Sequence, residues 1–170
     1  MNIRTEERKD YQEVYSLNEE AFGGSDESLL IERIRASEQF IPELSLVAEE
    51  AGNIIGHVLF SKAVVVDEGK EQDVIVLAPV AVKPERQKTG IGSQLIQEGL
   101  RRCRDLEYGL VLLIGHPSYY PRLGFKPARQ FQLELKQFKV PDEVFMVYEV
   151  IEGSLGRIKG ELLYPGAFFA

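Results

Sequence analysis

The amino-acid sequence predicts a mixed α/β domain whose sheet is partly antiparallel. Three observations support this fold class. Two apolar, β-branched runs flank the tight turn Ala51-Gly52-Asn53, which is the pattern of a β-hairpin. A strand–helix–strand unit follows over residues 73–115, and its crossover is expected to be right-handed. Two helical segments precede the hairpin and further strands follow the unit, so both element types alternate along the chain.

The first forty residues are expected to form one short strand and two helices. Asn2–Arg4 is a candidate edge strand. Arg8–Phe22 carries apolar side chains near helical spacing, and Gly23–Gly24 is expected to end that helix. A second helix is expected from Ser25 or Asp26, either of which can cap it, through Ser37.

Three strands are expected next, joined by turns at residues 51–53 and Asp67–Glu71. They are Leu44–Glu50, Ile54–Val66 and Asp73–Val82. Proline has no N–H to donate to a strand ladder, so we expect a bulge or break near Ala78–Pro79.

The second half of the chain begins with the clearest helix, Ile91–Leu106, which has a continuous apolar stripe. Gly109–Gly115 is apolar throughout, as is typical of a strand buried on both faces. His116–Leu123 is expected to be a connector with at most one helical turn. The remaining strand candidates are Gln130–Leu135, Val144–Ile151 and Arg157–Tyr164.

Length and charge limit the function classes. The chain has 170 residues, which suits one domain, and its formal net charge of −7 disfavours nucleic-acid binding. No apolar run approaches the ~18 residues that a membrane span needs. The N-terminus is charged and lacks the apolar core of a signal peptide. We therefore expect a cytoplasmic protein that binds neither nucleic acid nor membrane.

Cys103 is the only cysteine of the chain. It allows no disulfide within the chain and no multi-cysteine metal site, so no metal is expected. It lies on the apolar stripe of the helix Ile91–Leu106, where a buried structural thiol is expected rather than a nucleophile.

The most informative segment is Leu77–Ile96, LAPVAVKPERQKTGIGSQLI. A strand ends there in a proline-marked turn, a basic, glycine-containing loop follows, and a helix then begins. The first N–H groups of a helix lack partners within the helix, and the helix dipole adds positive charge at that end. The segment therefore predicts a site for a phosphorylated ligand on Arg86–Ser93, with local basic charge from Lys83, Arg86 and Lys88.

Two common phosphate-binding motifs do not match this segment. A P-loop needs GK[ST] after the glycine, but here Lys88 precedes the glycines. The dinucleotide fingerprint GxGxxG needs a glycine where this chain has Leu95. A nucleotide-binding protein that uses the same helix end stays an alternative.

A longer pattern is more specific. Gln87–Gly92 matches [QR]-x-x-G-x-[GA] directly after VAVKPER, and Tyr120–Phe125 matches Y-x-x-x-G-F downstream. These two motifs, in this order, resemble those of the GNAT superfamily of N-acetyltransferases. The segments GHPSYYPRLGF and GELLYPGAF are similar to sequences in one branch of small bacterial predicted N-acetyltransferases.

The resemblance implies the GNAT fold for residues 1–170 as a single domain. Its central sheet is mixed, mostly antiparallel, splayed at the cofactor site and flanked by helices. The core is expected over about residues 3–150, with a C-terminal strand extension over residues 151–170.

The resemblance also implies that acetyl-CoA is the acyl donor. Loop N–H groups would hold the pyrophosphate, Gly90 and Gly92 would allow close approach of the backbone, and the end of the preceding strand would bind the pantetheine like an added strand. The residues implied in acetyl-CoA binding are Val80, Ala81, Val82, Arg86, Gln87, Lys88, Thr89, Gly90, Ile91, Gly92 and Ser93.

The implied reaction is direct attack of an amine on the thioester. Tyr120 occupies the family position of the proton donor to the leaving thiolate, and its ordinary pKa of about 10 keeps it protonated. The neighbouring Tyr119 lacks the four-residue spacing to Gly124. His116 is either a proton relay or a structural or cofactor-contacting residue, and the sequence leaves both roles open.

The base that deprotonates the amine is not identified by the sequence. A lysine-type amine has a pKa of about 10.4, so it must lose a proton before it attacks. His57 alternates with apolar residues in its strand, which favours a half-buried structural role. Glu27 and Glu32 lie in the helical region that builds acceptor specificity in the superfamily, but an exposed helix face explains them equally well.

The sequence therefore predicts an acetyl-CoA-dependent N-acetyltransferase that acts on a small-molecule or peptide amine. The alternative is a non-catalytic acyl-CoA-binding or regulatory module with the same fold. The acidic composition favours a cationic acceptor, and the chain is expected to be a monomer or a homodimer.

Overall fold

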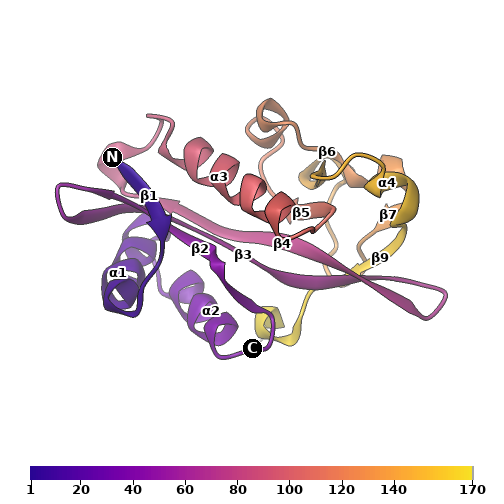
Figure 1. Cartoon of the computed structure of the whole chain (residues 1–170), viewed down its shortest axis with the longest axis horizontal. Coiled ribbons are helices and arrows are strands. Elements are labelled where there is room, and N and C mark those ends of the chain that lie inside the picture. The colour runs from indigo at the N-terminus through magenta and orange to yellow at the C-terminus, as the bar shows by residue number, and fades with distance from the viewer. Residues whose placement is uncertain (170) are drawn as a thin grey trace.

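The computed structural model describes residues 1–169, which form a nine-stranded sheet with helices on both faces (Figure 1). Helix α3 lies on one face, and α1 and α2 lie on the other. The helices are α1 (Tyr11–Phe22), α2 (Asp26–Arg35), α3 (Ile91–Asp105) and α4 (Ser154–Arg157). The strands are β1 (Asn2–Thr5), β2 (Phe40–Glu50), β3 (Asn53–Asp67), β4 (Lys70–Val82), β5 (Leu110–Ile114), β6 (Lys126–Pro127), β7 (Leu133–Glu134), β8 (Phe145–Glu149) and β9 (Gly160–Leu163).

The sheet has the order β1-β2-β3-β4-β5-β8-β6, and β9 pairs with both β3 and β7. All pairs are antiparallel except β4 with β5 and β7 with β9. The parallel pair β4–β5 is joined by α3, which is the expected strand–helix–strand unit. The predicted mixed, mostly antiparallel sheet with flanking helices is thus confirmed.

Strands β4 and β5 are neighbours over a short stretch only. Ile75 pairs with Val111 and Val76 pairs with Leu112, and no further pair between these strands is found in residues 1–169. Beyond this point β4 continues beside β3, and β5 continues beside β8. The sheet therefore opens between β4 and β5, on the side where α3 begins.

The predicted irregularity near Ala78–Pro79 is confirmed. Val58 of β3 pairs with Val80, whereas Phe60 pairs with Leu77, so one residue of β3 faces two of β4. The missing N–H of proline explains why the bulge lies here. The bulge places the end of β4 beside the gap between β4 and β5.

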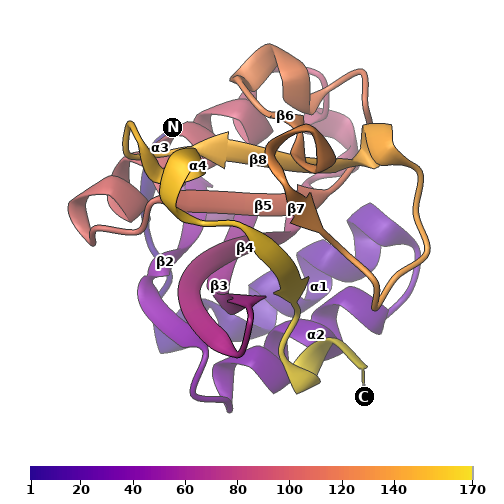
Figure 2. The same ribbon diagram turned by 90° about the vertical axis from the view of Figure 1, so that its right-hand side faces the viewer.

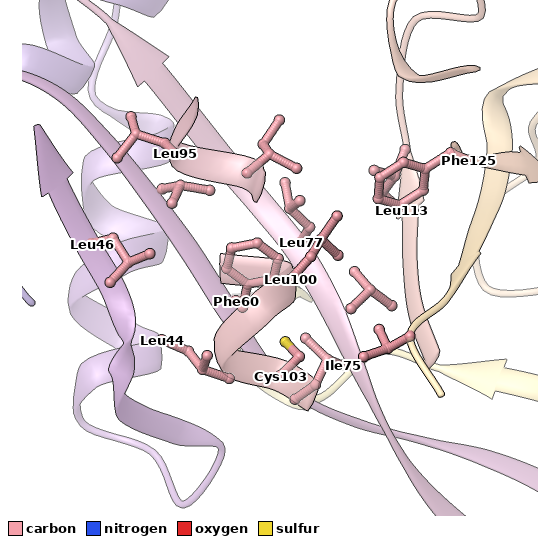
Figure 3. Packing of buried hydrophobic residues seen from close by; sticks show 14 of the residues in the cluster. Leu44, Leu46, Phe60, Ile75, Leu77, Leu95, Leu100, Cys103, Leu113 and Phe125 are labelled. Atoms are coloured by element: carbon pink, nitrogen blue, oxygen red, sulfur yellow. The ribbon is translucent and has the colours of Figure 1, made fainter. Parts of the chain in front are cut away.

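Two layers of buried side chains hold the helices on the sheet. On one face, the apolar stripe of α3 packs on side chains from β2, β3, β4 and β5 (Figure 3). Gly99 of α3 lies against the ring of Phe60, and a Cβ at Gly99 would stand 2.0 Å from that ring. Cys103 is fully buried in this layer, and burial raises the pKa of its thiol to about 12, which confirms the expected structural thiol.

The opposite face is covered by two different groups of residues. Helices α1 and α2 bury one end, and the C-terminal segments around β7 and β9 bury the other. Figure 2 shows the chain leaving β9 and running to the side of α2, where the carbonyl of Ala167 accepts a hydrogen bond from Arg33. Phe168 packs against the buried clusters of both ends.

Several expected boundaries are wrong. The turn expected at Asp67–Glu71 consists of Glu68 and Gly69 alone, because both adopt positive φ and allow a tight hairpin. Strand β2 begins at Phe40, four residues earlier than expected.

The predictions for the C-terminal third are the least accurate. The strand expected over Gln130–Leu135 is a 3-10 turn, Ala128–Phe131, followed by the two-residue β7, since Gln132 adopts φ of 63° between them. The two-residue β6 was not expected. The strand expected over Arg157–Tyr164 is replaced at its start by α4, and β9 covers Gly160–Leu163 only.

Candidate active site

The loop before α3 presents a row of free backbone donors. Gly90 adopts φ of 90° as the N-cap of α3, and Lys88 adopts φ of 64°. Within residues 1–169, no backbone or side-chain acceptor is found for the N–H groups of Lys88 through Ser93. These donors, at the positive end of a 15-residue helix, suit an anion such as a phosphate.

The side chains of the loop are arranged around this row. Gln87 donates from Nε2 to the carbonyl of Val82 at 3.1 Å, which ties the loop to the end of β4. Arg86 forms an ion pair with Glu50, and this ion pair lowers the carboxyl pKa of Glu50. The guanidinium of Arg86 is thus engaged by the protein, and the side chain of Lys88 is exposed.

A cavity of about 370 Å³ adjoins the loop, and we name it the loop cavity. It extends from the donors at the start of α3 to the end of β5. Its lining residues are Val80, Val82, Arg86, Gln87, Lys88, Gly90, Ile91, Gly92, Ser93, Gly115, His116, Tyr119 and Tyr120. The structure therefore gathers most of the sequence-predicted residues around one cavity, while Ala81 is buried beneath α1 and α2 and Thr89 is exposed beside the cavity.

A second cavity, of about 410 Å³, lies where β4 and β5 separate, and we name it the aromatic cavity. Its walls come from α1, α2, the bulge of β4, the end of β5 and the C-terminal segments. Its lining residues are Phe22, Glu27, Leu30, Leu77, Ala78, Pro79, Val80, Ile114, Tyr120, Phe138, Tyr164 and Phe168.

The two cavities share Val80 and Tyr120. These residues lie at the gap between β4 and β5, and each of them lines both cavities. A group bound in the loop cavity can therefore meet a group bound in the aromatic cavity beside these two residues.

Tyr120 is held in place by its neighbours. Its ring packs directly over Gly115, where a Cβ would stand 2.3 Å from the ring, and it contacts Tyr119 and Phe125 edge-on at centroid distances of 5.0 and 5.7 Å. Burial, reinforced by Tyr119, raises the pKa of Tyr120 to about 12. The phenol thus keeps its proton at neutral pH and can donate it.

Tyr119 points elsewhere. Its hydroxyl lies 2.9 Å from Oγ of Ser93, in the first turn of α3, and beside Gly92. The two adjacent tyrosines therefore face different surroundings: Tyr119 faces the end of the loop cavity where α3 begins, and Tyr120 faces the junction of the two cavities.

The histidines occupy contrasting places. His116 is exposed at the rim of the loop cavity, where its Nδ1 accepts hydrogen bonds from the N–H and the hydroxyl of Ser118. His57 is fully buried beneath α1 and α2 and is not half-buried as expected. Its Nε2 lies 3.1 Å from the hydroxyl of Ser45, and burial lowers its pKa to about 3.

Glu27 and Glu32, the two glutamates considered as bases, lie in different places. Glu27 lines the aromatic cavity, whereas Glu32 lines a different hollow, between α1 and α2. Within residues 1–169, no cluster of three or more His, Cys, Asp or Glu side chains is arranged to hold a metal ion. The helices of this part of the chain are too short or too polar to span a membrane.

Sequence reasoning did not identify most of the aromatic cavity. Phe138, Tyr164 and Phe168 carry no motif that marks them as site residues. The available signal was the density of aromatic residues in the ending LLYPGAFF. It indicates an apolar surface and does not indicate which surface.

Comparisons with known proteins agree with this geometry. A family model described as an acetyltransferase (GNAT) domain matches residues 2–128. The uncharacterized N-acetyltransferase YjhQ of Escherichia coli (strain K12) is 34% identical over 137 residues, which cover 81% of this chain and 76% of YjhQ.

Two solved structures are similar over nearly the whole chain. One is the GNAT family N-acetyltransferase YhbS of Escherichia coli in complex with CoA, with a TM-score of 0.91, 28% identity, and coverage of 99% of this chain and 92% of that one. The other is a GNAT family acetyltransferase from Brucella melitensis in complex with acetyl-CoA, with a TM-score of 0.78, 31% identity, and coverage of 98% and 97%. From the motifs, the fold and these matches together, the chain belongs to the GNAT family of N-acetyltransferases.

Proposed function

We propose that this GNAT acetyltransferase transfers the acetyl group of acetyl-CoA to a primary amine of a small molecule or peptide by direct attack on the thioester. The observation that carries the proposal is that the loop cavity and the aromatic cavity share Val80 and Tyr120. One cavity offers free N–H donors for phosphates, and the other is largely apolar. The CoA and acetyl-CoA complexes of the two similar structures support acetyl-CoA as the donor.

The loop cavity offers groups that suit the phosphates and the amides of CoA. The N–H groups of residues 88–93 would hold the pyrophosphate, and the main chain of Val80 and Val82 would pair with the pantetheine amides at the open edge of β4. Arg86 would first have to leave Glu50 in order to reach a phosphate. When bound, acetyl-CoA supplies the activated acetyl group.

The protein's own groups then donate a proton to the leaving sulfur and stabilise the charge on the thioester oxygen. The bound ammonium releases one proton to water, and the neutral nitrogen forms a bond to the acetyl carbon as the carbon–sulfur bond breaks. Tyr120 donates its proton to the departing sulfur and regains one from the new amide nitrogen. A main-chain N–H at the bulge beside Val80 stabilises the charge that develops on the thioester oxygen.

His116 contributes to this site from the loop cavity. Its Nδ1 is engaged by Ser118, so its Nε2 is the nitrogen left to contact acetyl-CoA or to relay a proton. Its position at the rim favours a role in shaping the turn 116–118 and in contacting acetyl-CoA.

The function is tested by following free thiol with acetyl-CoA and a panel of primary amines. We expect saturable turnover with at least one amine, and we expect ATP and NAD to leave CoA binding unchanged. Tight binding of CoA without thiol release from any amine would favour the non-catalytic module instead.

The role of Tyr120 is tested by Tyr120→Phe. We expect kcat to fall by about 10²-fold or more, because the leaving sulfur loses its proton donor, while the Kd for acetyl-CoA changes little. Tyr119→Phe is the matched comparison: it removes a hydroxyl from the adjacent residue, so the KM for acetyl-CoA should change more than kcat. Unchanged turnover by Tyr120→Phe would remove the assignment.

A further inference from the structure

The aromatic cavity lies in a seam between two separate coverings of the same sheet face. Phe22, Glu27 and Leu30 come from α1 and α2, whereas Phe138 and Tyr164 come from the C-terminal segments. Figures 1 and 2 show the C-terminal stretch crossing from β9 to the side of α2. The cavity is therefore built from segments more than a hundred residues apart.

The C-terminal wall of this cavity is firmly attached. Arg33 of α2 donates from Nε to the carbonyl of Ala167 at 2.8 Å, which fixes the tail to the helix layer. Gln137 and Tyr164 exchange two hydrogen bonds, one from Gln137 Nε2 to the carbonyl of Tyr164 and one from the Tyr164 N–H to Gln137 Oε1. Tyr164 also packs edge-on against Phe138 and Phe168, with centroids 5.3 and 4.9 Å apart.

The lining of the cavity has a definite chemistry. The cavity has twelve lining residues. Eleven of them are apolar or aromatic, the twelfth is Glu27, and none is Lys, Arg or His. The side chain of Glu27 is partly buried in the first turn of α2, and it makes no hydrogen bond or ion pair with the residues of 1–169. One unpaired carboxylate among aromatic rings suits one positive charge on an apolar body.

We infer that the aromatic cavity binds the acyl acceptor as a monoamine carried on an apolar, ring-bearing body, with Glu27 attracting its ammonium. This inference rests on the proposed function, and it names the substrate class for the same site. The attacking nitrogen must arrive beside Tyr120 and Val80, because these two residues line both cavities.

The local lining argues against the polycationic acceptor that the overall charge favours. A polyamine or an aminoglycoside carries several charges, and each would need its own acceptor when buried. The lining offers one carboxylate. The acidic surface can attract any cation, but the cavity favours a cation that carries a single charge.

The experiment compares kcat/KM for acetyl transfer to 2-phenylethylamine and to spermidine. We expect 2-phenylethylamine to be preferred by about 10-fold or more, since burying an unpaired charge is costly. Glu27→Gln should raise the KM for 2-phenylethylamine about 10-fold with a smaller effect on kcat, and Glu27→Asp should restore part of it. Phe168→Ala should weaken the preference for the ring-bearing amine.

The matched control is Glu32→Gln, which makes the same change five residues further along α2 and outside the aromatic cavity. It should leave the KM for 2-phenylethylamine unchanged. Every variant must retain the far-UV circular dichroism spectrum and the acetyl-CoA Kd of the parent protein, which separates a local effect from a folding defect.

A binding measurement keeps this inference separate from the proposed function. Calorimetry with 2-phenylethylamine in the presence of CoA should show saturable binding that Glu27→Gln weakens, whether or not turnover occurs. Preference for spermidine, or a Glu27→Gln variant with parental amine binding, would overturn the substrate class. Failure to bind CoA, or binding of both ligands without thiol release, would instead contradict the proposed function.

Discussion

Tyr120 and His57 are both titratable side chains shielded from water, and burial acts on them in opposite directions. Burial disfavours the charged form, so it raises the pKa of the phenol to about 12 and lowers the pKa of the imidazole to about 3. For Tyr120 the result is a retained proton that can be donated. For His57 the result is a neutral ring enclosed among Ser45, Glu6 and Arg35, with its Nδ1 unpaired.

His57 should make the fold sensitive to acid. In the unfolded chain the imidazole takes up a proton below its ordinary pKa of about 6.5, whereas the folded protein resists protonation down to about pH 3. The unfolded state therefore binds more protons between these values, and the free energy of unfolding falls as the pH falls. From near pH 7 to near pH 5 we expect a loss of about 2 kcal/mol from this group.

Urea unfolding at the two pH values measures this loss in the parent protein and in His57→Gln. The variant should lose about 2 kcal/mol less, because its amide does not titrate. NMR titration gives an independent readout, in which the His57 ring signal stays constant above pH 5 and is assigned with a His116→Gln variant. Equal acid sensitivity of both proteins, or a His57 signal that shifts near pH 6.5, would contradict the expectation.

At the scale of elements, α3 sits close to the sheet because Gly99 has no side chain. A Cβ there would stand 2.0 Å from the ring of Phe60, which is fully buried, so the ring or the helix would have to shift. Gly99→Ala should therefore destabilise the protein by about 1–3 kcal/mol, even though alanine favours a helix more than glycine does.

Thermal or urea unfolding checks this expectation. Gln97→Ala, an exposed substitution on the same helix, is the control and should change stability little. Because α3 also presents the loop donors, Gly99→Ala should weaken CoA binding if the helix moves outward. A stabilised Gly99→Ala variant would show that the ring of Phe60 can move away.

The elements that the sequence predicts well are those with local causes. The stripe of α3, the glycine after α1 and the proline at the bulge act within a few residues, so their places follow from the sequence. The strand expected over Gln130–Leu135 failed because a left-handed residue and the contacts of Arg129 with Glu134 and Asp142 determine the path there. Such contacts depend on the folded chain.

The same distinction applies to the site. The loop donors are contiguous, from Lys88 to Ser93, and their arrangement follows from a strand, a loop and a helix in sequence. The aromatic cavity combines residues from Phe22 to Phe168, and only the fold brings them together. The sequence therefore predicts the proposed site of the acetyl donor, and the structure is needed to describe the proposed site of the acceptor.

The C-terminal residues belong to the architecture of the whole molecule. Strand β9 pairs with β3 at Val64–Val66, and Leu162 is fully buried. Phe168 packs against the buried clusters at both ends of the sheet face. These contacts support the proposal that residues 1–170 form one domain, in which the extension 151–170 is an integral part.

We therefore expect the whole chain to unfold in a single transition. Urea curves followed by far-UV circular dichroism and by tyrosine fluorescence should share one midpoint, and the amide of Leu162 in β9 should exchange as slowly as that of Val65 in β3. Removal of residues 154–170 should lower the stability of the entire molecule, because it uncovers Val65 and Val74 and removes one wall of the aromatic cavity. A separate early transition confined to the C-terminal residues, with β3 still protected from exchange, would make the extension an independent appendage and would leave the aromatic cavity without a fixed wall.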